Sequence, residues 1–311
     1  MMRRARICRE TLARLERAWP EGAPFTDAQL LRSKPAKTVL AVNSASGPVV
    51  ASFFGPDSLD QRPAGVAAAH ELLSDRLAPG AVPALINFLP DADLVITEQV
   101  QGDTVADLIR TDPQASETAI RAAATWLATL HDLVNRPDAK HDFSGRVKAA
   151  LIAAPPEMAT EITRLAKQLT GTPVRQVKFH NDYKPDNVVI AGDRTCAFEF
   201  RNTKFRPASV DAAQFLTRSA IYALSVRDAG PVNRIGIPTS VADPFDTAYG
   251  SAISAEPMTE LFILTNIILA EITRTALRPT RRALLNRHGR YGRGLRKLLA
   301  LSEAALSQSN G

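Results

Sequence analysis

Cysteine, aromatic residues and long apolar runs are all scarce in this chain of 311 residues. Its two cysteines, Cys8 and Cys196, lie far apart and match no metal-ligand or CxxC spacing, which favours reduced thiols over a disulfide framework. The longest apolar run, residues 261–270, contains Thr265 and Asn266 and is about half a membrane span. No apolar segment follows the first arginines, so we expect no secretory signal, no membrane partner and a cytoplasmic protein.

The net charge of +6 is distributed unevenly along the chain. Residues 1–17 carry six arginines and two glutamates, a charge of +4, and residues 272–297 carry eight arginines and one lysine, a charge of +9. Residues 298–311 contribute −1, which leaves −6 on residues 18–271. The body of the chain is therefore acidic, and its two ends are basic.

The basic segment 272–297 has three interpretations: a solvated helical face, a nucleic-acid surface, or a site for an acidic partner. Tyr291 is its single tyrosine, and it contains no phenylalanine or tryptophan, so the aromatic residues that stack on single-stranded bases are missing. We therefore expect no nucleic-acid partner. The pattern favours a solvated or self-complementing face, which could dock on the chain's own acidic body or on a second subunit.

The first hundred residues combine a short helix with several strands. Apolar residues at helical spacing predict a helix over residues 8–18, closed by Trp19-Pro20. The next β-prone runs are separated by turns and predict a three-stranded antiparallel meander over residues 29–33, 38–42 and 49–54. An alanine- and leucine-rich helix and two further strands are predicted over residues 64–77, 84–88 and 94–97.

From about residue 102 the pattern becomes mainly helical. Apolar residues recur at helical spacing in three segments, which predict helices over residues 102–109, 116–134 and 157–169. Strand-like runs interrupt the helices over residues 174–179, 188–190 and 196–200. The simplest architecture is α+β: a basic helix over residues 1–24, a small β-rich lobe over 25–101 and a larger helical lobe over 102–311.

The densest polar cluster is the loop of residues 180–187, with the sequence HNDYKPDN, between two strand-like runs. Loops held by rigid strands commonly carry catalytic groups. Asp182 can accept a proton from an attacking hydroxyl, Asn187 can ligate Mg²⁺, and Lys184 can neutralise a phosphoryl group in transfer. This layout suits phosphoryl transfer, which depends on positioning and charge stabilisation. The alternative is a structural turn, because Asp, Asn and Pro are common turn residues.

The same loop resembles the kinase catalytic-loop pattern H-x-D-x-x-x-x-N. Downstream, Phe198-Glu199-Phe200 followed by Pro207 and Asp211 before an apolar helix is similar to aminoglycoside phosphotransferases and choline-kinase-like enzymes. The resemblance covers about residues 25–300. It implies a two-lobed protein-kinase-like fold, with ATP and Mg²⁺ as cofactors and a small hydroxyl-bearing molecule as acceptor. We also expect Asp211 to cap the following helix and, by the resemblance, to steady the catalytic loop.

The resemblance assigns roles to individual residues. Asp182 would deprotonate the acceptor hydroxyl, and Lys184 would stabilise the transferring phosphoryl group. Asn187 and Glu199 would hold Mg²⁺, although the family has aspartate where this chain has Glu199, whose extra methylene moves the carboxylate. A plain strand carboxylate is the alternative for Glu199. The adenine of ATP would lie between the lobes, against the backbone of residues 98–100, from Glu98 to Val100.

The nucleotide-binding motifs of the family are altered in this chain. Ser52 stands where the third strand normally carries a phosphate-binding lysine, and Val66 stands near the position of its glutamate partner. The turn of the first hairpin has no glycine, but Lys34 or Lys37 could reach a phosphate from it. Loss of both members of an ion pair is coherent, because either charge left alone and buried would be costly.

Two main functions remain open. The catalytic loop favours an enzyme, an ATP- and Mg²⁺-dependent phosphotransferase. The altered motifs favour a catalytically impaired pseudokinase that acts as a binding or regulatory module. Because the family's acceptors are often cationic and residues 18–271 are acidic, a cationic acceptor is an expectation for the enzyme. A polyanion binder that uses the basic ends is a third hypothesis, and it would show steeply salt-dependent binding.

Overall fold

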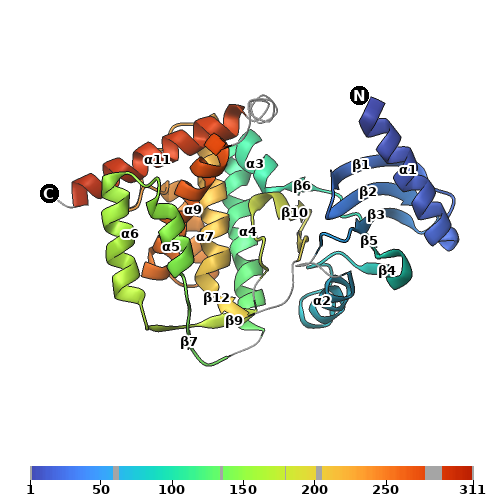
Figure 1. Cartoon of the computed structure of the whole chain (residues 1–311), viewed down its shortest axis with the longest axis horizontal. Helices are drawn as coiled ribbons and strands as arrows, with labels where there is room; N and C mark the ends of the chain where they lie inside the picture. Colours follow the sequence, from blue (N-terminus) through green and yellow to red (C-terminus); the bar gives the residue numbers. More distant parts are fainter. Residues whose placement is uncertain are drawn as a thin grey trace. The chain divides into compact units, whose positions relative to one another are not determined.

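The computed structural model describes residues 2–58, 63–133, 136–178, 180–200, 205–276 and 289–309 (Figure 1). Contacts divide the chain into two units: residues 1–102 with 191–203, and residues 103–190 with 204–311. The first unit is a small antiparallel sheet with helices, and the second is mainly helical. The predicted α+β fold class is confirmed. Residues 191–203, which follow the catalytic loop in sequence, group with the sheet.

The first unit is built on a five-stranded antiparallel sheet with the order β1-β2-β3-β5-β4. Its strands span Thr26–Lys34 (β1), Lys37–Ser44 (β2), Gly47–Phe54 (β3), Leu85–Leu89 (β4) and Leu94–Glu98 (β5). The unit also contains helices α1 (Met2–Ala18) and α2 (Pro63–Arg76), short turns of 3-10 helix at Pro20–Gly22 and Pro90–Ala92, and strand β11 (Arg194–Ala197). The predicted meander is therefore confirmed, and two-residue turns join its three strands.

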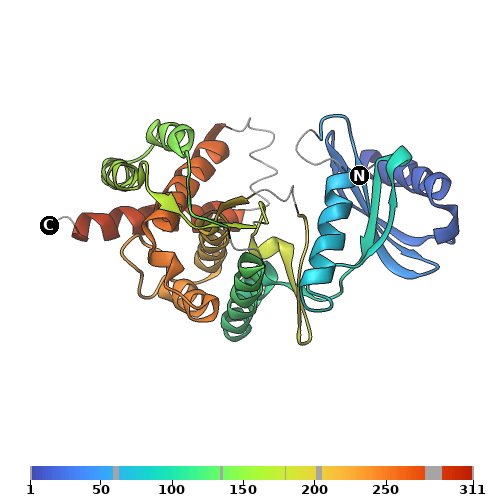
Figure 2. The same ribbon diagram turned by 90° about the horizontal axis from the view of Figure 1, so that it is seen from below.

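Helices cover both faces of this sheet, as Figure 2 shows. Because side chains alternate along a strand, Phe53 and Phe54 of β3 point to opposite faces. Phe53 packs in one cluster with Leu15 of α1, and Phe54 packs in another with Val66 of α2. Both faces of the sheet are thus buried, which explains the nearly continuous apolar sequence of β3.

The second unit is a helical assembly arranged around α7 (Figure 1). Its helices span Val105–Thr111 (α3), Pro113–Asp132 (α4), Ser144–Leu151 (α5), Pro156–Leu169 (α6), Ala208–Val226 (α7), Thr239–Tyr249 (α8), Pro257–Ala276 (α9) and Gly289–Ser309 (α11). Short strands lie at Asp103–Thr104 (β6), Ala139–Lys140 (β7), Pro173–Val174 (β8), Gln176–Lys178 (β9), Val188–Ala191 (β10) and Phe205–Pro207 (β12), with 3-10 turns at Pro185–Asn187 and Ile253–Ala255. Most side chains of α7 are buried, because it contacts α3, α8, α9 and α11.

The structure corrects two of the predicted strands. The run predicted over 174–179 is split into β8 and β9, and Phe179 lies outside the described residues. The strand predicted over 196–200 ends at Ala197, because Glu199 has a left-handed backbone with φ of 67°. Strand β12, which pairs antiparallel with β9, has no counterpart in the prediction.

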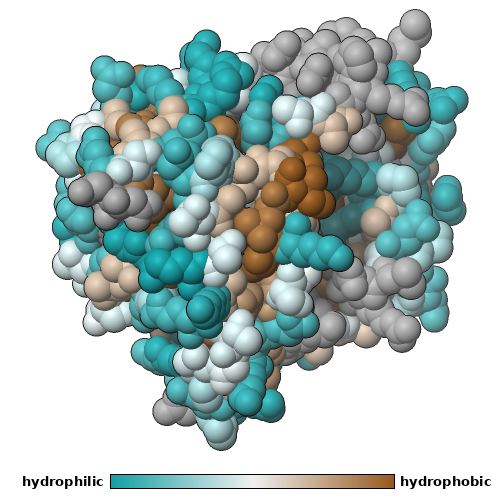
Figure 3. Space-filling view, turned by 60° about the vertical axis from the view of Figure 1, so that its left-hand side comes forward, coloured by the Kyte–Doolittle hydropathy of each residue, from teal (hydrophilic) through white to brown (hydrophobic). Residues whose placement is uncertain are grey.

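No helix among the described residues is long and apolar enough to cross a membrane. The face drawn in Figure 3 is mainly hydrophilic, with one apolar strip across it. Within the second unit, the apolar side chains of α7 and α9 are instead turned inward, where Phe215, Leu216, Leu261 and Leu264 are fully buried.

Helix α11 packs closely against the backbone of α7 at Gly294. A Cβ atom built on Gly294 would overlap the carbonyl oxygen of Ile221 and lie 3.1 Å from the backbone nitrogen of Ser225. Gly294→Ala should force the helices apart and lower the free energy of unfolding by about 1–3 kcal/mol in urea denaturation. Gly292→Ala is the control, because its Cβ would meet nothing closer than 3.7 Å. Equal stability of the two variants would contradict this packing.

Candidate functional site

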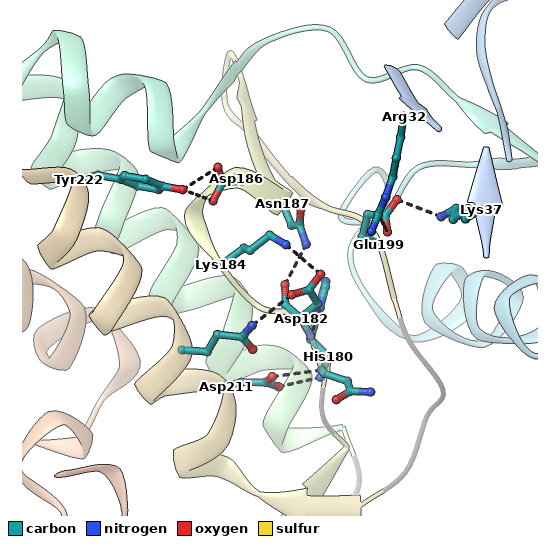
Figure 4. Close-up of polar contacts among 12 residues, drawn as sticks. Arg32, Lys37, His180, Asp182, Lys184, Asp186, Asn187, Glu199, Asp211 and Tyr222 are labelled. Carbon is teal, nitrogen blue, oxygen red and sulfur yellow. Dashed lines mark hydrogen bonds and ion pairs between the residues drawn. The ribbon is translucent and has the colours of Figure 1, made fainter. Parts of the chain in front are cut away.

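The catalytic loop is fixed to α7 by one buried carboxylate (Figure 4). The two oxygens of Asp211 accept hydrogen bonds from the backbone nitrogens of His180, at 2.6 Å, and Asn181, at 3.1 Å. Asp211 is fully buried, and Asn181 adopts a left-handed conformation with φ of 72°. The prediction that Asp211 caps the helix is wrong, because α7 begins at Ala208 and Asp211 lies inside its first turn. Its role is to hold the loop.

Aromatic packing holds the apolar side of the same loop. The Tyr183 ring is stacked on Trp126 of α4, at 5.5 Å between centroids, and on Phe215 of α7, at 5.3 Å. Its hydroxyl donates to the carbonyl oxygen of Ala123 at 2.7 Å. Burial, with the nearby charge of Asp211, raises the pKa of Tyr183, so the ring remains neutral. Tyr183 therefore ties the loop to α4 and α7 at once.

His131 supports this arrangement from α4. Its Nε2 lies 3.5 Å from the Asp211 carboxylate, and its Nδ1 lies 2.7 Å from the hydroxyl of Tyr249. The side chain is buried. The catalytic loop is thus held by α4, α7 and α8 together, which makes its geometry rigid.

Three residues predicted from the loop sequence lie together. The Asp182 carboxylate accepts from Lys184 Nζ at 2.9 Å and, through its other oxygen, from Gln214 Nε2 at 3.1 Å. The Asn187 side chain donates to the Asp182 carbonyl oxygen at 2.9 Å. Asp182 and Asn187 are both buried. Two donors therefore orient the carboxylate, one on each of its oxygens.

Sequence reasoning missed Gln214. It lies three residues after Asp211, on the same face of α7. The same helix therefore supplies Asp211, which holds the loop, and Gln214, which donates a hydrogen bond to the Asp182 carboxylate. The signal was present as large polar residues at helical spacing, Asp211, Gln214, Arg218 and Tyr222, within a helix whose other residues are apolar or small. Tyr222 donates to Asp186 of the loop at 2.7 and 2.8 Å.

Glu199 lies in the first unit as the centre of an ion cluster (Figure 4). Lys37 Nζ of β2 lies 2.9 Å from one of its oxygens, and Arg32 of β1 lies 3.4 Å from the other. The side chains of Lys37 and Glu199 are only 11% and 17% exposed. A lysine–glutamate pair therefore exists in this unit, but it joins the first hairpin to Glu199 and was not predicted.

The remaining residues of the altered motifs have ordinary positions. Ser52 is half-buried in β3 and pairs with Val39 and Val95. Val66 is buried, whereas Glu71, one turn later in α2, is exposed. Glu71 therefore does not replace the missing glutamate. Lys34 is exposed at the end of β1, opposite Lys37 in the hairpin, with the turn Pro35-Ala36 between them, so the predicted hairpin without glycine is confirmed.

Several polar groups of the predicted adenine-binding segment, residues 98–100, already form hydrogen bonds within the first unit. The backbone nitrogen of Glu98 donates to Ala84 and that of Gln99 to Pro48. The Glu98 carboxylate forms two hydrogen bonds of 2.9 Å with Arg194 of β11. Val100, at the other end of the predicted segment, is half-buried.

A large cavity lies in the second unit, with a volume of about 1210 Å³. Asn181 and Gln214 line it, so it opens beside the carboxylate of Asp182. Eight arginines line it from β12, α3, α5, α7, α9 and α11, and among its described lining residues Asp186 is the one carboxylate. No sequence motif connects these elements, so the sequence did not predict the cavity.

The cavity revises the interpretation of the basic segment. Arg274, Arg290, Arg293 and Arg296 face a concave site, rather than forming only a solvated or self-complementing surface. Residues 277–288 of the segment lie outside the described residues. Part of the positive charge of the basic segment 272–297 therefore lies in the cavity next to the catalytic loop.

Asp211→Ala should destabilise the protein, because two buried backbone donors lose their acceptor. We expect a loss of about 2–4 kcal/mol in the free energy of unfolding, with faster hydrogen exchange at the amides of His180 and Asn181. Asp228→Ala is the matched control, since Asp228 is exposed. Unchanged exchange at both amides in the Asp211 variant would contradict the assigned anchoring role.

Glu98 should make stability depend on pH. The hydrogen bonds from Arg194 outweigh burial and hold the Glu98 pKa below its ordinary 4.5. A lowered folded-state pKa stabilises the protein above about pH 4.5, and this contribution is lost as pH falls through the folded value. Glu98→Gln should cost about 1 kcal/mol at pH 7, limited by solvent screening, and less below pH 4. A difference that stays constant down to pH 3 would refute this.

Comparison with known proteins agrees with these observations. The model of the phosphotransferase enzyme family matches residues 27–231. No curated protein matches the chain. The solved structure of an amicoumacin kinase, hAmiN, in complex with AMP-PNP, Ca²⁺ and Ami covers 94% of this chain and 96% of its own, with 13% identity and a TM-score of 0.59.

Two further structures have the same fold. The macrolide 2′-phosphotransferase MphH of Brachybacterium faecium covers 94% of this chain and 98% of its own, with 15% identity and a TM-score of 0.59. The choline kinase LicA of Streptococcus pneumoniae covers 94% and 99%, with 16% identity and a TM-score of 0.51. At these identities the likeness establishes the fold alone, and the predicted kinase-like fold is confirmed. With its family model matched over residues 27–231, this chain belongs to the phosphotransferase enzyme family.

Proposed function

We propose that this protein transfers a phosphoryl group from ATP, with Mg²⁺, to a hydroxyl group of a small molecule. Family membership supports phosphoryl transfer as the reaction class. The observation that carries the proposal is the Asp182 carboxylate, held by Lys184 and Gln214 beside a cavity large enough for a small-molecule acceptor.

In this mechanism Asp182 is the catalytic base. The acceptor hydroxyl oxygen attacks the γ-phosphorus of ATP as its proton passes to the Asp182 carboxylate, and the bond from the γ-phosphorus to the bridging oxygen breaks, releasing ADP. Gln214 and Lys184 keep the carboxylate in place, 3.1 and 2.9 Å from its oxygens. Lys184 also supplies positive charge next to the transferring group.

The chemistry of the donors fits Mg²⁺ as the cofactor. Asn187 directs its amide nitrogen to the Asp182 backbone, which leaves its side-chain oxygen as the donor for a metal. Glu199 offers a carboxylate, and no group of three or more His, Cys, Asp or Glu among the described residues could hold a metal. Magnesium commonly uses one or two protein oxygens together with substrate phosphates. Bound there, it would neutralise charge on the phosphates.

Lys37 is our candidate for the phosphate-binding lysine that Ser52 replaces. Glu199 holds its ammonium group at 2.9 Å, in the way an acidic partner positions such a lysine. Lys34, across the same hairpin, would add a second, exposed cation. The carbonyl of Glu98 and the backbone of Val100 would contact adenine. The amicoumacin kinase structure contains a nucleotide and a divalent cation, which supports the proposed use of both.

The alternative function is a pseudokinase that binds without turnover. It is favoured by the ion cluster of Glu199, because Arg32 and Lys37 already neutralise the carboxylate that would ligate Mg²⁺. A thermal-shift titration with ATP, with and without Mg²⁺, measures whether nucleotide binds and whether the metal increases the shift. Binding without phosphoryl transfer to any acceptor would favour the pseudokinase.

Asp182→Asn should reduce kcat by about 10²–10⁴-fold, because the amide cannot accept the proton. The assay is Mg²⁺-dependent release of ADP with the best acceptor from a broad panel of alcohols. Asp228→Asn, an exposed aspartate, is the control and should keep full activity. Unchanged kcat in Asp182→Asn, or no Mg²⁺-dependent turnover of any alcohol by the wild-type protein, would refute the proposed function.

A further inference from the structure

Arg146 of α5 is a partly buried cation whose hydrogen-bond partners are neutral. Its Nε donates to the Thr265 hydroxyl at 2.7 Å, and its Nη2 donates to the Asn266 side chain of α9. The guanidinium lies 5.3 Å from the centre of the Phe262 ring. Among the described residues, no carboxylate forms a salt bridge with it. Burial lowers the pKa of Arg146, but an arginine remains charged at neutral pH.

Arg218 of α7 is a second cation of this kind. Its guanidinium lies 4.9 Å from the centre of the Tyr291 ring of α11, and within the described part of the chain it makes no salt bridge. Asp186, the one carboxylate among the described lining residues, accepts from Tyr222 and lies 3.8 Å from Arg110. Burial opposes the charge of Arg218, but the nearby Tyr291, Tyr222 and Asp186 outweigh it and raise the pKa.

Helix α11 adds three more positive charges to the same cavity. Arg290, Arg293 and Arg296 are spaced by three residues, which places them along one side of the helix. All three line the cavity. By contrast, Arg274 is paired with Glu271 of its own helix, so its charge is largely compensated. Among the described lining residues, eight arginines therefore face a single carboxylate, Asp186.

A guanidinium that is partly withdrawn from water is stabilised by an anion, and among the described residues Arg146 has no carboxylate partner to supply one. We propose that the cavity binds an anionic acceptor, a hydroxyl-bearing small molecule with a phosphate or carboxylate group that Arg146 and Arg218 hold. Phosphorylation of the acceptor hydroxyl rests on the proposed function, but binding of the anionic group does not depend on turnover. It replaces the expectation of a cationic acceptor, which these arginines would repel.

The geometry suits an anion held at a distance from the reaction. The planar guanidinium forms two parallel hydrogen bonds with phosphate or carboxylate, which orients the ligand as well as attracting it. Asn181 and Gln214 line the cavity beside Asp182, so an acceptor anchored by its anionic group would extend its hydroxyl toward the base. Binding energy from the anion would then position the hydroxyl for attack.

The concave shape favours a small molecule over a nucleic acid. Eight arginines converge on one cavity of about 1210 Å³, which is near the size of ordinary ligand pockets. A groove that follows a nucleic-acid backbone would also need aromatic platforms for the bases, but Tyr222 and Tyr291 of the cavity are already covered by Arg110 and Arg218.

Isothermal titration of the full chain tests the proposal with four sugars that share a hydroxylated ring or chain: glucose 6-phosphate, gluconate, glucose and glucosamine. Titrations are done without ATP, so they are independent of catalysis. We expect glucose 6-phosphate or gluconate, or both, to bind at least tenfold more tightly than glucose and glucosamine. Phosphate-only or carboxylate-only binding would identify which anionic group the acceptor carries.

Variants assign the binding to the cavity. Arg146→Gln and Arg218→Gln should each weaken binding of the preferred anion by about tenfold or more. Arg121→Gln, which removes the same charge from an exposed position on α4, should leave it unchanged. Circular dichroism and the melting temperature confirm that each variant is folded, and Arg146→Lys, which keeps the charge, provides a second folded test with partial binding expected.

Three results would overturn the proposal. One is tighter binding of glucose or glucosamine than of both acids. Another is equal loss of anion binding in Arg121→Gln and in the cavity variants. The third is a single-stranded oligonucleotide that binds more tightly than both acids and depends on Arg146 and Arg218. Anion binding that follows the expected pattern, in a protein without turnover, would uphold the site and refute only the proposed function.

Discussion

The buried carboxylate of Asp211 is the interaction on which the site depends. It binds two successive backbone amides of the catalytic loop and thereby fixes the loop to α7, the helix at the centre of the second unit. From this anchor, the same face of α7 supplies Gln214 to the Asp182 carboxylate and Tyr222 to Asp186. One helix therefore positions Asp182, the loop and part of the cavity, and its rigidity follows from the burial of most of its side chains.

Charge is the second constraint, and its placement matters more than its total. The chain carries +6 overall, while residues 18–271 are acidic. In the folded protein, arginines from β12 and five helices come together in one cavity, where the described lining contains a single carboxylate. The net charge of the described cavity lining is therefore positive, whereas that of residues 18–271 is negative. Since binding depends on the potential inside a cavity, the proposed acceptor site would select its ligand by charge.

Different parts of the account were predictable to different degrees. Strands with clear alternation and short turns, such as β2 and β3, were found from sequence because their pattern is local. Asp182, Lys184 and Asn187 were found because they lie within eight residues of one another. Three pairs were not found: Lys37 with Glu199, Gln214 with Asp182, and Arg146 with Arg218. The members of each pair lie 32 to 162 residues apart in the sequence, and only the fold brings them to the same site. Sequence spacing carries no information on such pairs, because tertiary packing creates them.

The kinetic specificity of phosphoryl transfer tests the account most directly. With ATP and Mg²⁺ fixed, kcat/KM is measured for matched alcohols that differ only in carrying a phosphate, a carboxylate, an amine or no charged group. The account predicts Mg²⁺-dependent turnover at least tenfold more efficient for an anionic alcohol than for its neutral and aminated partners, with the preference weakened by added salt. Preferred phosphorylation of the aminated or neutral alcohol would contradict it.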